Sequence, residues 1–515
     1  MRKVSVVLAV IFLVGAVVGC GSAASASSVK TSVSIVVSEN LTRLDPHNQT
    51  AIPGYCAMDM IFDPLLFSDH KGNYTPGLAT EWSYSDDGTE WTFKLREGVK
   101  FHNGEDFDAD DVVATFQRFI DENTSLGHYT SWLTQLQSVE KIDDYEVKIT
   151  LSSPYALFEQ ALSLAPIIPN EAYAEKGNAL WNEQLMYGTG PWIFEEWVDG
   201  QHIKWRKNDQ YWGVNDSTYE EVYMRFILEP STAIAGQLSG EIDAYMPNGG
   251  IPEEMISQYD NYEATEMVSF QSTLLKYLGM QCGEMSAFKD KAVREAFSLA
   301  IDAQLLIDAF SPGGGIPSGI LVPTCVGFDP DLPVYEFNPE KAKSVLASSS
   351  YAGEPIVLLS NTNVFRAEEL LLGISQMANE VGFNTSVEIT EFAVFSQRRA
   401  NGEYTAFLTE MSITGGDIHP IINLRVLSNS HRHDYVNPEL NGLIEKANVE
   451  MNVATRAALL TEVNRIIREE YAPMIGLVQM PYTYAINKDV NGIVYYPDGW
   501  YFFRNVGTSK TAMGD

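Results

Sequence analysis

One stretch of the chain decides its fold: residues 77–119 read GLATEWSYSDDGTEWTFKLREGVKFHNGEDFDADDVVATFQRF. Within it, residues 91–95 (WTFKL) alternate apolar and polar side chains, which predicts a β-strand. Residues 108–119 instead repeat apolar side chains at helical spacing, and Asp108 suits the N-cap of that helix. The stretch therefore predicts a strand followed by a helix, as in an α/β protein.

Strand-like and helix-like segments keep alternating through the rest of the chain, which again predicts α/β layers. A chain of 515 residues is expected to form more than one folding unit. The further predicted segments are a strand at 146–151, a loop at 311–318, and helices at 293–310, with a break near Asp302, at 366–381 and at 454–471.

The first residues, MRKVSVVLAVIFLVGAVVGC, predict an export signal. Two basic residues precede an apolar run of about fifteen residues, which is too short to span a bilayer comfortably and suits a cleavable signal. Small residues before Cys20 are typical of a bacterial lipoprotein, so we expect a signal peptide at 1–19, a lipid on the Cys20 thiol and a flexible tether at 20–32. The alternative is an ordinary signal peptide that happens to carry a cysteine.

The composition excludes several classes of partner. A net charge of −34 argues against nucleic acid, whose phosphates require a basic face, and against electrostatic docking on anionic lipid. If Cys20 is lipidated, Cys56, Cys282 and Cys325 remain, so at most one disulfide can form within the chain. The sequence contains no G-x-S-x-G, H-E-x-x-H or P-loop motif. The sequence therefore indicates no cofactor and no resident metal, and a surface enzyme is only a remote alternative.

Several short motifs follow one another in a characteristic order. The motifs are the opening stretch 77–119, together with LDPH at 44–47, GTGPW at 188–192, NDQYW at 208–212, LSGEIDA at 238–244, FKDKAVREAFSLAID at 288–302 and FNPEKAKSVL at 337–346. In these motifs the chain resembles the extracytoplasmic solute-binding proteins of family 5, which serve ABC importers of dipeptides, oligopeptides and nickel.

This resemblance implies a periplasmic-binding-protein-like (type II) fold, in which two α/β lobes surround a cleft and an additional domain sits on lobe one. Chain crossings near Tyr277 and Lys488 would form the hinge, and closure around the ligand would be a hinge motion. The implied boundaries are 33–77, 188–275 and 490–515 for lobe one, 78–187 for the additional domain and 276–489 for lobe two.

The resemblance also implies a function. The protein would be a monomeric lipoprotein on the extracytoplasmic face of the membrane, capturing short peptides and delivering them to separate permease and ATPase subunits. The alternative within the same scaffold is a nickel or other metal chelate, or another small solute.

Several parts of the chain are candidates for the ligand site. In residues 48–58 (NQTAIPGYCAM), Pro53 and Gly54 predict a turn where the backbone approaches the ligand, with Tyr55 and Cys56 facing the cleft. The alternative is that Tyr55 packs in the core and Cys56 is a buried, inert thiol. Aromatic residues near the crossings, namely Tyr277, Tyr482 and Tyr484, would wall the cleft.

The loop at 411–424 (MSITGGDIHPIINL) resembles the family's cleft loop, in which an acid holds the ammonium group of a peptide. Asp417 is the matching acid, but the loop is one residue short and His419 stands where a second acid is usual. The alternative for Asp417 is a turn-capping role. Arg366 is the nearest match for an arginine that clamps the ligand carboxylate, although its offset differs by about two residues, with an ordinary surface arginine as the alternative.

Histidines gather near this loop, and they raise the question of a metal. His419, His431 and His433 lie close together in sequence. Arg432 would repel a cation, so solvated loop histidines are the favoured interpretation. A contact of Cys56 and His419 with a bound metal chelate stays open as the alternative.

Overall fold

The computed structural model describes residues 30–49, 51–69, 72–122, 126, 133–323, 325–412, 417 and 433–508. The predicted signal peptide, Cys20, most of the tether, His419 and His431 lie outside these ranges. Among the described residues, no helix is both long and apolar enough to cross a membrane.

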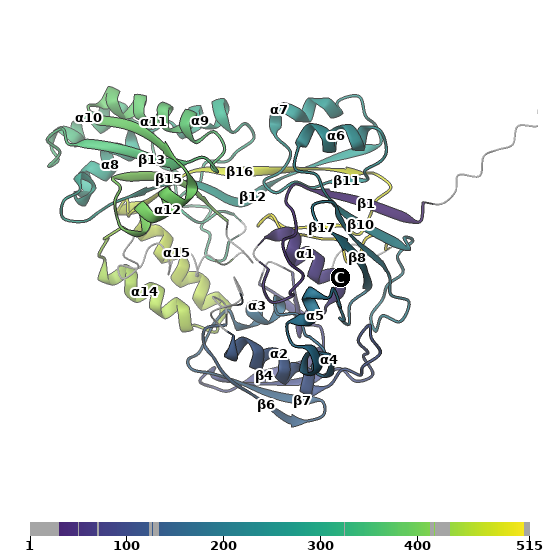
Figure 1. Ribbon diagram of the computed structural model, residues 1–515. Helices are drawn as coiled ribbons and strands as arrows, with labels where there is room; N and C mark the ends of the chain where they lie inside the picture. Colours follow the sequence, from purple (N-terminus) through teal and green to yellow (C-terminus); the bar gives the residue numbers. More distant parts are fainter. Residues whose placement is uncertain are drawn as a thin grey trace, which may run out of the picture.

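A ten-stranded mixed sheet runs through both halves of the molecule (Figure 1). Its two central strands, β12 (Thr265–Met280) and β16 (Met474–Asn487), pair antiparallel along almost their whole length, with a register shift between Gln271 and Leu275. They extend from one lobe into the other, so both chain crossings lie side by side in one ribbon. The strand order is β14-β13-β15-β12-β16-β11-β1-β10-β9-β8.

Lobe one forms the half of the sheet that ends at β8, with helices packed on it. Its elements are β1 (Ser32–Val37), α1 (Ile52–Ile61), β8 (Trp192–Val198), β9 (His202–Lys207), β10 (Glu221–Phe226), α6 (Pro230–Leu238), β11 (Ala244–Tyr245), α7 (Glu253–Ile256), the 3-10 turn Ser257–Tyr259, β17 (Val494–Tyr495) and β18 (Tyr501–Phe502).

The additional domain carries a separate four-stranded sheet in the order β4-β5-β7-β6, below the main sheet in Figure 1. Its own buried core includes Trp91, Phe93 and Phe116. Its elements are β4 (Ala79–Tyr84), β5 (Glu90–Leu95), α2 (Ala109–Asp121), β6 (Leu136–Asp143), β7 (Glu146–Leu151), α3 (Phe158–Ser163), α4 (Asn170–Lys176) and α5 (Ala179–Asn182), next to the hairpin β2 (Leu66–Ser68) and β3 (Tyr74–Pro76).

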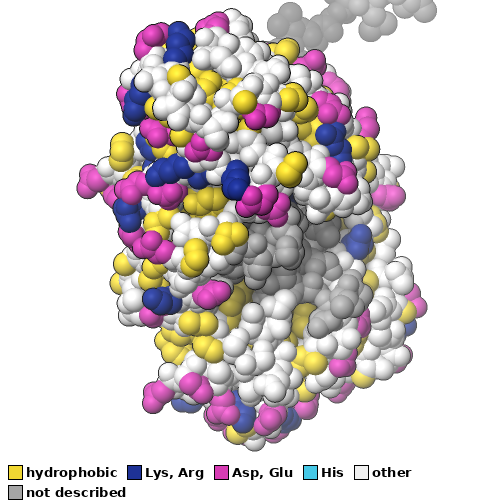
Figure 2. All heavy atoms as spheres, turned by 90° about the vertical axis from the view of Figure 1, so that its left-hand side faces the viewer, with side chains coloured by type: hydrophobic (Ala, Val, Ile, Leu, Met, Phe, Trp, Pro, Cys, Tyr) yellow, Lys and Arg dark blue, Asp and Glu magenta, His cyan; other side chains and the backbone are white. Residues whose placement is uncertain are grey.

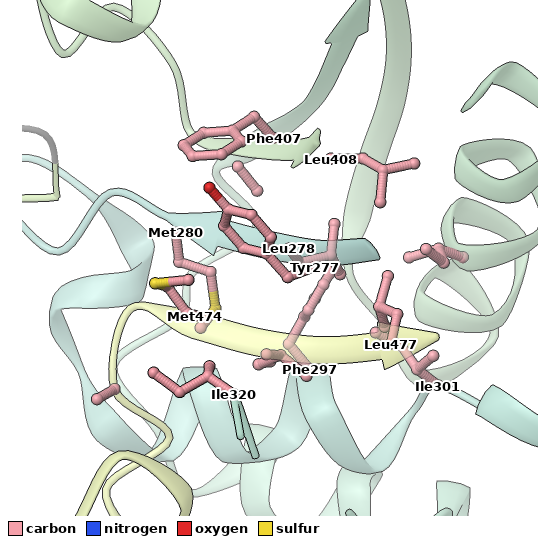
Figure 3. Close-up of a cluster of buried hydrophobic side chains, with 14 of the residues drawn as sticks. Tyr277, Leu278, Met280, Phe297, Ile301, Ile320, Phe407, Leu408, Met474 and Leu477 are labelled. Carbon is pink, nitrogen blue, oxygen red and sulfur yellow. The ribbon is translucent and has the colours of Figure 1, made fainter. Parts of the chain in front are cut away.

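Lobe two forms the other half of the main sheet, around the core drawn in Figure 3. Its elements are the 3-10 turn Ala287–Lys289, α8 (Lys291–Leu299), α9 (Ala303–Phe310), α10 (Pro339–Ala347), β13 (Pro355–Asn361), α11 (Ala367–Val381), β14 (Asn384–Thr390), α12 (Phe392–Ala400), β15 (Ala406–Met411), α14 (Pro438–Val449) and α15 (Val453–Glu469).

The local predictions are confirmed where the pattern was strong. Residues 91–95 lie in β5, and Asp108 caps α2 by accepting a hydrogen bond from the Asp110 backbone N–H at 2.8 Å. The expected break at Asp302 separates α8 from α9, because the Asp302 carboxylate caps α9 by accepting from the Leu305 N–H. Near the end of β16, Tyr482, Tyr484 and Ile486 pack in the same core as the strands of lobe one.

The motif residues hold the scaffold together. The Gly190 N–H donates to the Ile61 carbonyl at 2.8 Å, and a Cβ at Gly188 would lie only 2.0 Å from that oxygen. The Asp63 carboxylate accepts hydrogen bonds from Thr189 and Trp212, at 2.8 and 2.7 Å. These motifs therefore join α1 to the strands of lobe one.

The LDPH motif forms a buried polar cluster with residues of the additional domain. Arg118 of α2 forms an ion pair with Asp45 at 2.6 Å, and its Nη1 donates to His47 Nδ1 at 2.9 Å. The Nε2 of His47 donates to the Pro166 carbonyl at 2.7 Å. Burial and the neighbouring guanidinium lower the pKa of His47 to about 3, so this imidazole is neutral.

Candidate ligand-binding cleft

A cleft of about 620 Å³ opens where the two lobes meet beside the β12–β16 ribbon. Lobe one contributes the loop at 248–254, and lobe two contributes the segment before α11 and the end of β15. Among the residues that line this cleft are Leu274, Lys276, Phe365, Arg366, Glu410 and Tyr482. A concave site of this size with a few convergent polar groups is typical of small-ligand recognition.

The lobe-one wall of the cleft is a glycine turn. Gly249 and Gly250 both have left-handed backbones, with φ of 82° and 81°. A Cβ at Gly250 would lie 2.8 Å from the Thr483 backbone nitrogen, so only glycine fits against the ribbon. Sequence reasoning missed this turn, although Asn248-Gly249-Gly250 is a turn signal.

The lobe-two wall contains a buried ion pair. Lys276 of β12 and Glu410 of β15 are directly opposite one another in the antiparallel pairing, with Nζ 3.6 Å from Oε1. The Lys276 side chain is fully buried, and its Nζ also donates to the Phe365 carbonyl at 2.8 Å. Burial lowers the pKa of Lys276 and raises that of Glu410, while each partner opposes the shift of the other. Neither Lys276 nor Glu410 was predicted from the sequence to belong to the site.

Arg366 lines the cleft, as the sequence predicted. It is the N-cap of α11 and has a left-handed backbone, with φ of 53°. About a third of its side chain is exposed (32%), and its Nη2 lies 4.0 Å from Oε2 of Glu254 in lobe one. Arg366 therefore faces the opposite lobe across the cleft.

The three predicted tyrosines have different positions. Tyr482 lines the cleft, with its ring edge-on to Phe270. Tyr484 is fully buried in the lobe-one core. Tyr277 is fully buried in lobe two, where its ring packs edge-on against Phe407 (Figure 3). Tyr277 and Tyr484 are thus core residues and not cleft walls.

The segment around Gly54 forms a helix and not the predicted turn. Pro53 and Gly54 lie in the first turn of α1, and a Cβ at Gly54 would meet the Gln49 side chain. The Tyr55 hydroxyl donates to the Gln49 carbonyl at 2.8 Å, and its ring stacks on Trp500. Tyr55 borders a small separate cavity of about 50 Å³ and is not among the residues that line the cleft.

The Cys56 side chain is fully buried in the lobe-one core, which is the alternative that the sequence left open. Its Sγ lies 2.6 Å from the Tyr501 carbonyl oxygen. Burial raises the pKa of this thiol well above its ordinary value. Cys56, Cys282 and Cys325 are all buried, and no disulfide joins any two of these described cysteines.

Asp417 is almost completely buried and is paired with a residue of α15. Its Oδ2 lies 3.2 Å from Nε of Arg456. The Nη1 of Arg456 also donates to the Ala156 carbonyl of the additional domain at 3.1 Å. Asp417 therefore lies at a junction between lobe two and the additional domain, and it is not among the described residues that line the cleft.

His433 is buried and is not a solvated loop residue. Its ring stacks on Phe407, and its Nδ1 lies 3.1 Å from the Tyr404 hydroxyl. The described parts of the chain contain no group of three or more metal-binding side chains. Figure 2 shows acidic and basic side chains mixed over the lobe-two face, so the net negative charge does not gather there into one patch.

Comparison with known proteins places these features in a family. The model of the bacterial extracellular solute-binding proteins, family 5 (middle region), matches residues 73–430. Heme-binding protein A of Haemophilus influenzae is 28% identical over 475 residues, which is 85% of each chain. The glutathione-binding protein GsiB of Escherichia coli is 25% identical and covers 94% of this chain and 95% of its own. The structure of HbpA2 from Haemophilus parasuis superimposes with a TM-score of 0.83 at 26% identity, covering 93% of this chain and 100% of that one.

Proposed function

Because the chain belongs to the bacterial extracellular solute-binding proteins of family 5, we propose that it captures short peptides in the cleft between its lobes and delivers them to the permease of an ABC importer. The single observation that carries the proposal is the cleft itself, which combines exposed charges of both signs with backbone groups from two lobes. The glutathione-binding relative supports the choice of ligand, since glutathione is itself a tripeptide. The protein would act by binding and would catalyse no reaction.

The chemistry of the lining residues suits a peptide. A peptide offers an ammonium group, a carboxylate and a backbone that both donates and accepts hydrogen bonds. Arg366 would take the carboxylate, because a guanidinium can hold it with two parallel hydrogen bonds. Glu253, Glu254, Glu410 and Asp498 are the acidic residues among those that line the same cleft, and Tyr482 supplies apolar area.

The first test is to purify the protein in its native state and to identify by mass spectrometry what mild acid releases from it. A series of short peptides is the expected result. A Tyr482→Ala variant should then bind these peptides at least several-fold more weakly, since its ring forms part of the cleft wall. Tyr84→Ala is the matched control, because Tyr84 is an exposed tyrosine of β4 in the additional domain. Release of no peptide, together with no binding in a screen of di- to hexapeptides, would overturn the proposal.

A second candidate ligand is heme or another metal chelate, and the 28% identical heme-binding relative favours it. His419 would be the residue to test first. Titration with hemin should shift the Soret band if heme binds, and nickel with free histidine should raise the melting temperature if a chelate binds. His419→Ala is expected to weaken either effect. If neither probe produces a change, the metal chelate is excluded.

We further propose that the protein is held at the extracytoplasmic face of the membrane by a lipid on Cys20, and that it works as a monomer beside separate permease and ATPase chains. Cys20→Ser should abolish incorporation of labelled palmitate and move the protein from the membrane fraction to the soluble fraction. A C20S protein that stays with the membrane would contradict the anchor. Sedimentation of the C20S protein at the mass of two chains would contradict the monomer.

A further inference from the structure

Lys276 carries a buried charge and is not among the residues that we propose to contact the ligand. Its side chain is fully covered, on the central strand β12 where the cleft and the lobe-two core meet. A lysine ammonium is costly to bury unless partners surround it. Among the described residues, its ammonium group lies 3.6 Å from the Glu410 carboxylate and donates to the Phe365 carbonyl oxygen at 2.8 Å.

The second of these contacts reaches the peptide unit that precedes Arg366. Arg366 has a left-handed backbone, which is unfavourable for a residue with a Cβ and persists only where its surroundings hold it. No side chain caps the N-terminus of α11 at this position. The charge-assisted hydrogen bond from Lys276 to the Phe365 carbonyl is therefore a restraint that acts directly on the orientation of Arg366.

The two cations also share one aromatic neighbour. The Lys276 Nζ lies 5.8 Å from the centre of the Phe365 ring, and the Arg366 Cζ lies 5.3 Å from it. Phe365 is half-exposed at the cleft. Lys276 thus adds positive potential behind Arg366, and Glu410 balances that charge from the neighbouring strand.

We propose that Lys276 is a positioning residue that holds Arg366 in the conformation that recognises a ligand carboxylate. Lys276 itself stays covered and does not touch the ligand. Glu410 keeps Lys276 charged and in place. The inference rests on the proposed function, and it narrows the ligands to those that carry a free carboxylate next to the lobe-two wall.

The experiment uses the full-length protein and two probes: a library of tripeptides with free C-termini and the same library with amidated C-termini. Isothermal titration gives the ratio of the two affinities for the wild type, Lys276→Met, Lys276→Arg and Arg366→Met. Lys289→Met is the matched control, because Lys289 is a lysine on the lobe-two surface that pairs with Glu284. Circular dichroism establishes that each variant folds.

The wild type should favour the free acids, and Lys276→Met should lose about tenfold in affinity for them while keeping its affinity for the amides. Lys276→Arg should recover part of the loss, because a guanidinium also donates to a carbonyl oxygen. A merely structural role would weaken both libraries equally. If Lys276→Met fails to fold, Glu410→Gln supplies the comparison, because it removes the carboxylate that holds Lys276 in place.

The outcomes separate the inference from its premise. If Arg366→Met abolishes the preference for free acids while Lys276→Met and Glu410→Gln retain it, the positioning role is wrong and the ligand site stands. If the wild type does not distinguish acids from amides, the assignment of Arg366 and the inference fall together. If the wild type binds neither library, the peptide function itself is overturned.

Discussion

Asp417 and Arg456 form a buried ion pair, with Oδ2 3.2 Å from Nε and only 6% of each side chain exposed. Arg456 lies in the first turn of α15 in lobe two and also donates to the Ala156 carbonyl of the additional domain. A second contact reinforces the junction, because the Ala156 N–H donates to the Asn448 carbonyl at 3.4 Å. Lobe two therefore contacts the additional domain at this junction, in addition to its connection to lobe one through β12 and β16.

Removing one partner of this pair should destabilise the protein more than removing both. Arg456→Met leaves the Asp417 carboxylate buried without its cation, which is expected to cost about 3 kcal/mol of unfolding free energy. Adding Asp417→Asn should recover part of that loss, because the stranded charge disappears. Urea denaturation of the two single variants and the double variant measures the coupling. Additive effects would show that the pair contributes no interaction of its own.

The same variants test whether Asp417 holds the ligand. If the carboxylate serves mainly the junction, the folded double variant should bind tripeptides as the wild type does. A loss of about tenfold or more for peptides with a free ammonium group, but not for N-acetylated peptides, would instead restore Asp417 as the ammonium anchor.

Acid should destabilise the cluster around His47. The pKa of His47 is about 3 in the folded protein, against 6.5 for an ordinary histidine. Between about pH 3 and pH 6.5 the unfolded chain binds a proton at His47 that the folded chain does not bind. The contribution of the neutral His47 to stability is therefore fully present above pH 6.5 and is lost as the pH decreases toward 3. The contribution reaches about 1.4 kcal/mol per pH unit within this window.

His47→Gln should be less stable than the wild type at pH 7, because the bonds to Arg118 and the Pro166 carbonyl are disturbed. Its stability should, however, decrease less steeply between pH 6 and about pH 4. Urea titrations at several pH values compare the two slopes. Parallel curves for the two proteins would show that His47 does not titrate with the lowered pKa.

Gly188 should tolerate no side chain. Gly188→Ala would place a Cβ 2.0 Å from the Ile61 carbonyl oxygen, which is backbone and cannot rotate away. We expect a loss of about 3 kcal/mol or a failure to fold. Gly442→Ala is the control, because Gly442 lies within α14 with open space around it, and alanine there should stabilise the helix by about 0.5–1 kcal/mol. Equal stabilities for the two variants would contradict the close approach.

Local chemistry explains which features could be predicted from the sequence. Asp108 was recognised as a helix cap, and a helix break was expected near Asp302, because caps and breaks depend on a few neighbouring residues. The prediction of a turn at Pro53-Gly54 was wrong for a local reason as well. Proline is favoured in the first turn of an α-helix as well as in a β-turn, and α1 begins at Ile52. The ordered motifs indicated the fold because they supply its packing contacts.

The charged wall of the cleft could not be predicted in this way. Lys276 and Glu410 meet only because β12 and β15 pair in one particular register, which no local pattern specifies. Asp417 illustrates the same limit: its position in the loop suggested a ligand contact, but its partner Arg456 lies on a distant helix. Arg366 was proposed because the resemblance offered it as the nearest match to a clamping arginine, not because its own neighbours indicated a site.

The buried thiols give a final test of the cores of both lobes. Cys56 lies in the lobe-one core, whereas Cys282 and Cys325 lie in the lobe-two core. Burial raises the pKa of the Cys56 thiol well above its ordinary value and that of the Cys282 thiol to about 12. Because the thiolate is the reactive form, Ellman's reagent should react slowly with the folded Cys20→Ser protein and should label three thiols in denaturant.

Cys56→Ala should lower the unfolding free energy by about 1–2 kcal/mol while leaving the affinity for tripeptides unchanged, since the Cys56 Sγ packs against Tyr501 and not in the cleft. Rapid labelling of one thiol, suppressed by added tripeptides, would show instead that Cys56 faces the ligand.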